Sequence, residues 1–96
     1  MALRAARAEW SGAVDRPAEA RALLAAAGKL ETGGRATQAL QAYLDARELL
    51  EAEGEREAVL KLLDAIGPLY YRLGEPAHST RIYQERLQLQ ASLTPG

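Results

Sequence analysis

The stretch LDAIGPLYYRLGEP, residues 63–76, combines a helical pattern of apolar side chains with a glycine that ends it. Leu63, Ile66 and Tyr70 recur at intervals of three and four residues, so they share one face of an α-helix. Gly74 supplies the residue type that most readily adopts the left-handed conformation at a helix C-terminus. The stretch therefore predicts a helix that ends in a tight turn.

The composition of the whole chain extends this prediction. The 96 residues include 20 Ala and 16 Leu, but only two Val, two Ile and no Phe. Ala and Leu are strong helix formers, whereas strands favour β-branched and aromatic residues. We therefore expect an all-α fold.

Glycines and prolines divide the chain into segments of helical length. Asp15 is a suitable N-cap, because its carboxylate can accept hydrogen bonds from the first backbone N–H groups of a helix. Short connections that contain glycine favour antiparallel neighbouring helices. We expect one domain, residues 1–96, made of a short N-terminal helix and two antiparallel hairpins, at residues 1–13, 16–53 and 55–93.

Pro68 interrupts the predicted first helix of the second hairpin. A proline inside a helix removes one backbone hydrogen bond, and its ring crowds the preceding turn. We therefore expect a kink near residues 64–68 or a break at Gly67-Pro68.

The two hairpins align when the sequence is shifted by about 40 residues, a length within the range of helical repeats. Similar residues then coincide at the turn, at a central aromatic position and near the end: Leu23 with Leu63, Ala25 with Ala65, Gly34 with Gly74, Tyr43 with Tyr83, and Leu49 with Leu89. Overall identity is low, but the matches fall at structural positions. This pattern is typical of stacked helical repeats.

The second hairpin resembles the tetratricopeptide repeat (TPR), whose pattern is W-x2-L-G-x2-Y, then A-x3-F and a closing Pro. Leu63 stands at the Trp position and Ile66 at the Leu position, while Gly67 and Tyr70 match. Tyr83 takes the aromatic position of the second helix. The period of about 40 residues differs from the usual 34 of the family, and the closing Pro is absent from both copies.

These positions have a physical interpretation as core residues. Gly67 allows two helices to approach closely, and Tyr70 and Tyr83 fill the space between helices. On this interpretation Tyr83→Ala costs about 3–5 kcal/mol, as for a large buried aromatic residue.

The resemblance also implies a binding surface, because the first helix of each TPR hairpin lines a concave face that holds a partner's peptide or helix. The expected contacts with a protein or peptide partner are Arg21, Leu24, Glu31, Lys61, Asp64, Tyr71 and Arg72. Tyr71 is the expected anchor, because it is rotated by about 100° from the inward-facing Tyr70 and because Tyr is enriched at interface hot spots. Leu24 and Gly28 stand where the chaperone-type clamp has Lys and Asn, which argues against recognition of chaperone tails.

The arginines of the second hairpin leave two interpretations open. Arg72, Arg81 and Arg86 form either a solubilising surface or a basic patch for an acidic peptide, since guanidinium groups pair well with carboxylates. His78, the only histidine, is expected at the surface. The acidic stretch 48–57 predicts a solvated loop with local ion pairs.

Composition and motifs argue against several function classes. The chain has no Cys and a net charge of −1, which removes thiol chemistry and gives no overall electrostatic attraction to nucleic acid. Glycine-rich phosphate loops and nucleophile-elbow motifs are absent, and no apolar run is long enough to span a membrane. We expect no enzymatic activity, cofactor, metal, nucleic acid or membrane, and a cytoplasmic location.

Two hypotheses of function remain. The first is a protein–protein interaction module that binds a partner peptide or helix on the concave face. The second is a structural element that self-associates, as a homodimer, through its terminal helices. Stacked repeats usually need about three copies to bury a continuous core. The ends therefore need covers, and Leu3 and Trp10 are candidates for covering the open face of the second helix.

Overall fold

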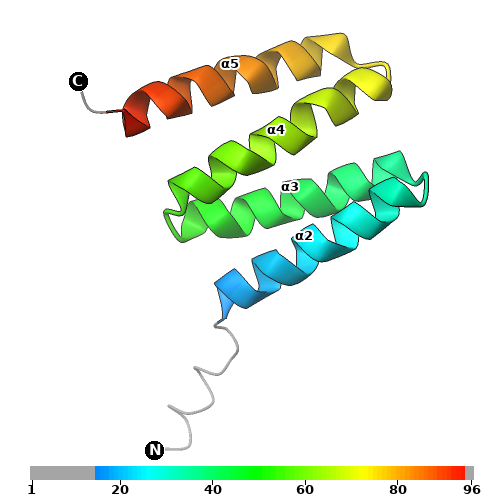
Figure 1. Ribbon diagram of the computed structural model, residues 1–96, viewed down its shortest axis with the longest axis horizontal. Coiled ribbons are helices and arrows are strands. Elements are labelled where there is room, and N and C mark those ends of the chain that lie inside the picture. The colour runs from blue at the N-terminus through cyan, green and yellow to red at the C-terminus, as the bar shows by residue number, and fades with distance from the viewer. Residues whose placement is uncertain (1–14, 95–96) are drawn as a thin grey trace, which may run out of the picture.

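The computed structural model describes residues 15–94 as four α-helices (Figure 1). They are α2 (Arg16–Thr32), α3 (Ala36–Ala52), α4 (Arg56–Arg72) and α5 (Pro76–Leu93). All regular secondary structure in this part of the chain is helical, which confirms the all-α class. The short helix expected within residues 1–13 lies outside the described residues.

The helices form a row in which each runs antiparallel to the one before (Figure 1). α2 packs on α3 and α4 packs on α5, so the two predicted hairpins are present. α3 also packs on α4, which joins the hairpins. The two hairpins begin and end at residues 16, 52, 56 and 93, each within one residue of the predicted ranges 16–53 and 55–93.

Each turn between helices contains a glycine in the left-handed conformation. The φ angles are 81°, 71° and 80° at Gly34, Gly54 and Gly74, which are evenly spaced along the chain. The amide after each glycine donates a hydrogen bond of 2.8–2.9 Å to a carbonyl of the preceding helix, from Arg35 to Leu30, from Glu55 to Leu50 and from Glu75 to Tyr70. This is the Schellman arrangement, which satisfies carbonyls at a helix end. The predicted turn at Gly74 is confirmed.

The first described helix has the N-cap that the sequence predicts. The Asp15 carboxylate accepts a hydrogen bond of 3.1 Å from the backbone N–H of Ala18. Pro17 lies in the first turn, where its missing N–H leaves no helical bond unmade. These two residues fix where α2 begins.

α4 supplies most of the large side chains of the core. Leu63, Ile66 and Leu69 are fully buried in it. The buried residues that α2 and α3 add are mostly alanines, namely Ala20, Ala27, Ala39, Ala42 and Ala46. Small side chains let helix backbones approach closely. Because the alanines have little apolar surface, the leucines and the isoleucine of α4 bury much of the apolar surface that stabilises the fold.

Pro68 does not break α4. The helix continues without interruption from Arg56 to Arg72, so the alternative of a break at Gly67-Pro68 is wrong, whereas a kink near residues 64–68 stays a prediction. The proline is exposed, whereas Ile66 and Leu69 beside it are completely buried. Burial of these neighbours holds the helix together across the lost hydrogen bond, because most helix stability in proteins comes from packing.

Gly67 and Tyr83 lie against each other where α4 packs on α5. A Cβ atom on Gly67 would lie 2.8 Å from Cζ of Tyr83, so the predicted close approach of helices at this glycine is confirmed. Tyr83 itself is 43% exposed, and the expectation of a buried core aromatic is wrong. In the part of the chain that the structure describes, no helix follows α5 to cover the outer side of the ring. Tyr43, its counterpart on α3, is only 8% exposed.

Candidate interaction surface

The residues expected to bind a partner lie on α2 and α4. α2 carries Arg21, Leu24 and Glu31, and α4 carries Lys61, Asp64, Tyr71 and Arg72. Leu24 and Glu31 are half-buried, and the other five are exposed. The structure brings two of them, Glu31 and Arg72, into contact with each other.

The contact between Glu31 and Arg72 links the ends of α2 and α4. Nη2 of Arg72 donates to Oε2 of Glu31 at 2.5 Å. The other carboxylate oxygen accepts a hydrogen bond of 2.8 Å from the hydroxyl of Tyr43 on α3. Three helices therefore meet at one carboxylate. Because Arg72 is already paired, an acidic ligand would have to compete with Glu31 for it.

The environment of Tyr43 shifts its pKa. Burial raises the pKa of the hydroxyl, and the hydrogen bond to Glu31 and the negative charge of that residue raise it further. The positive charge of Arg72 opposes these effects. The hydroxyl consequently keeps its proton to higher pH than an ordinary tyrosine does.

Asp64 and Arg86 form a second ion pair, which joins α4 to α5. Two of the three arginines in the suggested basic patch, Arg72 and Arg86, are thus neutralised by carboxylates. Sequence reasoning did not foresee these partners, because they lie 41 and 22 residues away along the chain. The structure therefore favours the solubilising interpretation of the arginines.

Tyr71 is the most exposed large hydrophobic side chain among residues 15–94, at 69%. Its neighbour Tyr70 is half-buried and stacks on the ring of His78, with the ring centroids 5.0 Å apart. The predicted outward orientation of Tyr71 is confirmed, and so is the surface position of His78. Nδ1 of His78 also lies 2.8 Å from a carboxylate oxygen of Glu75.

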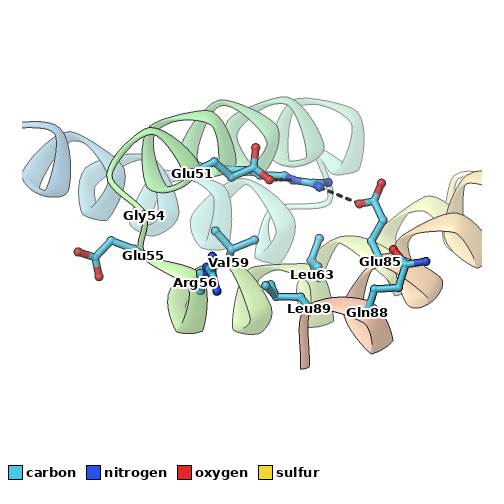
Figure 2. A pocket seen from close by; sticks show the side chains of 10 residues that line it. Glu51, Gly54, Glu55, Arg56, Val59, Leu63, Glu85, Gln88 and Leu89 are labelled. Atoms are coloured by element: carbon cyan, nitrogen blue, oxygen red, sulfur yellow. Dashed lines mark hydrogen bonds and ion pairs between the residues drawn. The ribbon is translucent and has the colours of Figure 1, made fainter. Parts of the chain in front are cut away.

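A cleft that the sequence did not predict lies between α3, α4 and α5 (Figure 2). This α3–α5 cleft has a volume of about 510 Å³. Val59, Leu63 and Leu89 form its apolar part. Around them lie the remaining lining residues, Arg47, Glu51, Gly54, Glu55, Arg56, Glu85 and Gln88.

Arg47 spans the α3–α5 cleft. Its guanidinium donates to Glu51 on the same helix at 2.8 Å and to Glu85 on α5 at 2.7 Å. Dashed lines in Figure 2 mark these two interactions at the labelled Glu51 and Glu85. Burial lowers the pKa of Arg47, but the hydrogen bonds and charges of the two carboxylates outweigh this, so the pKa is raised. The Arg47–Glu51 pair agrees with the local ion pairs predicted for the acidic stretch.

A second cleft of about 490 Å³ lies between α2 and α3. The apolar part of this α2–α3 cleft consists of Ala22, Leu23 and Leu49, and three carboxylates, Glu19, Asp45 and Glu48, surround it. The signal in the sequence that relates the two clefts is the alignment of residues 40 positions apart, which pairs Leu23 with Leu63 and Leu49 with Leu89.

Comparisons with known proteins give no match: no family model, no curated protein and no solved structure is similar to the chain. Within residues 15–94, no group of three His, Cys, Asp or Glu side chains is placed to hold a metal ion. None of the four described helices is long and apolar enough to cross a membrane. The chemistry that the described surface offers to a ligand is apolar contact, hydrogen bonding and ion pairing.

Proposed function

We propose that the chain is a protein-interaction module that binds a peptide or helix of a partner protein on the concave face that α2 and α4, the first helices of the two hairpins, would line. In this proposal it is a short TPR-like array of two hairpins, and it acts in the cytoplasm by binding without chemical turnover. Support for the array comes from the turn glycines Gly34, Gly54 and Gly74, whose even spacing along the chain gives helices and hairpins of matching length.

The observation that carries the proposal is the exposure of Tyr71. A tyrosine that is 69% exposed on a continuous, well-packed helix presents a large rigid side chain to solvent. Such side chains lose little conformational entropy on binding, and Tyr is enriched among residues that dominate interface energetics. Lys61 is also exposed, and residues 61, 64, 68 and 71 follow the helical spacing of one face.

The experiment is selection of random peptides from a phage-displayed library on the immobilised full chain. Selected peptides are then measured against the wild type, Tyr71→Ala and Leu87→Ala. Leu87 is a matched control, because it is 66% exposed but lies on α5. We expect Tyr71→Ala to weaken peptide binding at least ~10-fold, equivalent to about 1.4 kcal/mol, while Leu87→Ala changes it little.

Two outcomes would contradict the proposal. Peptides that lose affinity for Leu87→Ala but not for Tyr71→Ala would place the binding surface on α5. Failure to enrich any peptide would contradict the proposed binding of a partner's peptide or helix. Helicity measured by circular dichroism should be equal in all three proteins, which excludes unfolding as the cause of lost binding.

A second function, self-association through a terminal helix, is favoured by a different observation. Tyr83 and Leu87 lie one turn apart on α5 and are 43% and 66% exposed. Paired apolar side chains on one helix face are suited to a symmetric contact between two copies. Light scattering at several protein concentrations tests this, since Leu87→Arg should abolish any dimer. A monomer at all concentrations would exclude it.

A further inference from the structure

The two clefts are built from corresponding residues. Five of the six residues that line the α2–α3 cleft have a counterpart, 40 positions later, in the lining of the α3–α5 cleft. The pairs are Glu19 and Val59, Leu23 and Leu63, Asp45 and Glu85, Glu48 and Gln88, and Leu49 and Leu89. The two clefts therefore share two leucines and an acidic residue in the same places.

One side of the α3–α5 cleft has no counterpart among the described residues that line the α2–α3 cleft. Arg47 and Glu51 of α3 line it, and Arg47 reaches across to Glu85 at 2.7 Å. In the α2–α3 cleft the counterpart of Glu85 is Asp45. No residue before Glu19 lines that cleft in the described part of the chain. The residue 40 positions before Arg47 is Arg7.

The charges around the α2–α3 cleft are of one sign. Glu19, Asp45 and Glu48 contribute three carboxylates. Asp45 accepts a hydrogen bond of 3.0 Å from the neutral Gln41, and among residues 15–94 none of the three carboxylates forms a salt bridge. An occupant that combines apolar side chains with arginine would complement both the leucines and the carboxylates.

The N-terminal segment of this chain has that combination in matching positions. Tyr43, Ala46 and Leu50 are the buried residues around Arg47 on α3. The residues 40 positions before them are Leu3, Ala6 and Trp10, all apolar, and they surround Arg7 in the same spacing.

We propose that the α2–α3 cleft is the docking site of residues 3–11 of the same chain, with Arg7 paired to Asp45 as Arg47 is paired to Glu85. The segment is joined to the start of α2 by only a few residues, so its effective concentration at the cleft is high. The docked segment closes this end of the row of helices to a partner. The face of α5 is then the end that stays open.

Trp10 gives a direct readout of docking, because it is the only tryptophan in the chain. We expect its fluorescence in the full-length protein to be blue-shifted from that of a free tryptophan amide and protected from acrylamide quenching. Asp45→Arg should red-shift the emission and raise the quenching. The charge-reversed double variant, Arg7→Asp with Asp45→Arg, should restore the wild-type values.

The control is Glu85→Arg, which breaks the corresponding ion pair in the α3–α5 cleft. It should leave the emission of Trp10 unchanged. Four results would overturn the proposal. One is a wild-type emission equal to that of the free amide. A second is an equal red shift in Asp45→Arg and Glu85→Arg, and a third is the absence of any shift in Asp45→Arg. The fourth is a blue shift that grows with protein concentration, which would assign the cleft to a second copy of the chain.

Discussion

The ring of Tyr83 occupies the space that a side chain at Gly67 would need. Cζ and Cε1 of the tyrosine lie 2.8 Å and 2.9 Å from the position of a Cβ on the glycine. Ser79 strengthens the same contact between α4 and α5, because its buried hydroxyl donates a 2.8 Å hydrogen bond to the carbonyl of Gly67. The close approach of these two helices thus depends on the absence of a side chain at position 67.

Gly67→Ala should therefore destabilise the protein by about 1 kcal/mol. Displacing the ring of Tyr83 costs about 1–3 kcal/mol as overpacking, and alanine returns about 1 kcal/mol through its higher helix propensity. In a Tyr83→Ala background the same substitution should become stabilising. Urea denaturation of the wild type, the two single variants and the double variant measures this change of sign. An equal effect of Gly67→Ala on the free energy of unfolding in both backgrounds would contradict the contact.

Because Tyr83 is 43% exposed, Tyr83→Ala alone should cost about 1–3 kcal/mol.

Two glycines should respond in opposite directions to alanine. Gly28 lies inside α2, and a Cβ atom added to it would meet open space, so Gly28→Ala should stabilise the protein by about 1 kcal/mol. Gly54 has a φ of 71°, which alanine adopts only with strain, so Gly54→Ala should cost about 1–2 kcal/mol. Thermal unfolding monitored by circular dichroism compares the two. A stabilised Gly54→Ala would show that this turn does not require a left-handed residue.

The raised pKa of Tyr43 predicts a loss of stability at high pH. Between the ordinary tyrosine value of about 10 and the raised value in the folded protein, the folded state binds more protons than the unfolded state. The contribution of Tyr43 is thus complete below about pH 10 and is lost as the pH rises through the folded pKa.

Tyr43→Phe is the variant that isolates this effect. It should cost about 1 kcal/mol at neutral pH, because it removes the hydrogen bond to Glu31. Its stability should fall less steeply than that of the wild type above about pH 10. Urea denaturation at a series of pH values measures both slopes, and parallel slopes would refute the assignment.

Arg47 and Arg72 should contribute unequally to stability. The side chain of Arg47 is 22% exposed and pairs with two carboxylates, whereas that of Arg72 is 56% exposed and pairs with one. Arg47→Met should cost about 1–3 kcal/mol. Arg72→Met should cost about 0–1 kcal/mol, and this cost should vanish at high salt, because an exposed pair is well screened. Equal costs for the two variants would mean that burial does not determine how much these ion pairs contribute to stability.

Local chemistry made much of the fold predictable. The turn at Gly74, the N-cap at Asp15 and the ends of the two hairpins depend on residues close in sequence, and all were predicted. The outward position of Tyr71 followed from helical spacing relative to Tyr70. The packing of Gly67 was also predicted, because a glycine at a helix contact needs no knowledge of the partner side chain.

The predictions that were wrong or absent depend on residues distant in sequence. The exposure of Tyr83 depends on which helix covers α5, and the continuity of α4 at Pro68 depends on the other helices that bury Ile66 and Leu69. The partners of Arg72 and Arg86 come from other helices. The alignment at 40 residues pairs the leucines of the two clefts, but it does not show how far apart the surrounding helices lie, so it does not predict the clefts themselves.

The extensive contacts among residues 15–94 join each helix to the next one along the chain. Such contacts span short stretches of sequence, and loop closure for them carries a small entropic cost. A nascent chain that exposes only α2 and α3 still lacks α4, which supplies most of the large side chains of the core. Packing during synthesis would therefore become stable when α4 joins the first hairpin, and α5 would be added last. The order of the helices in the row is therefore also the order in which they would pack during synthesis.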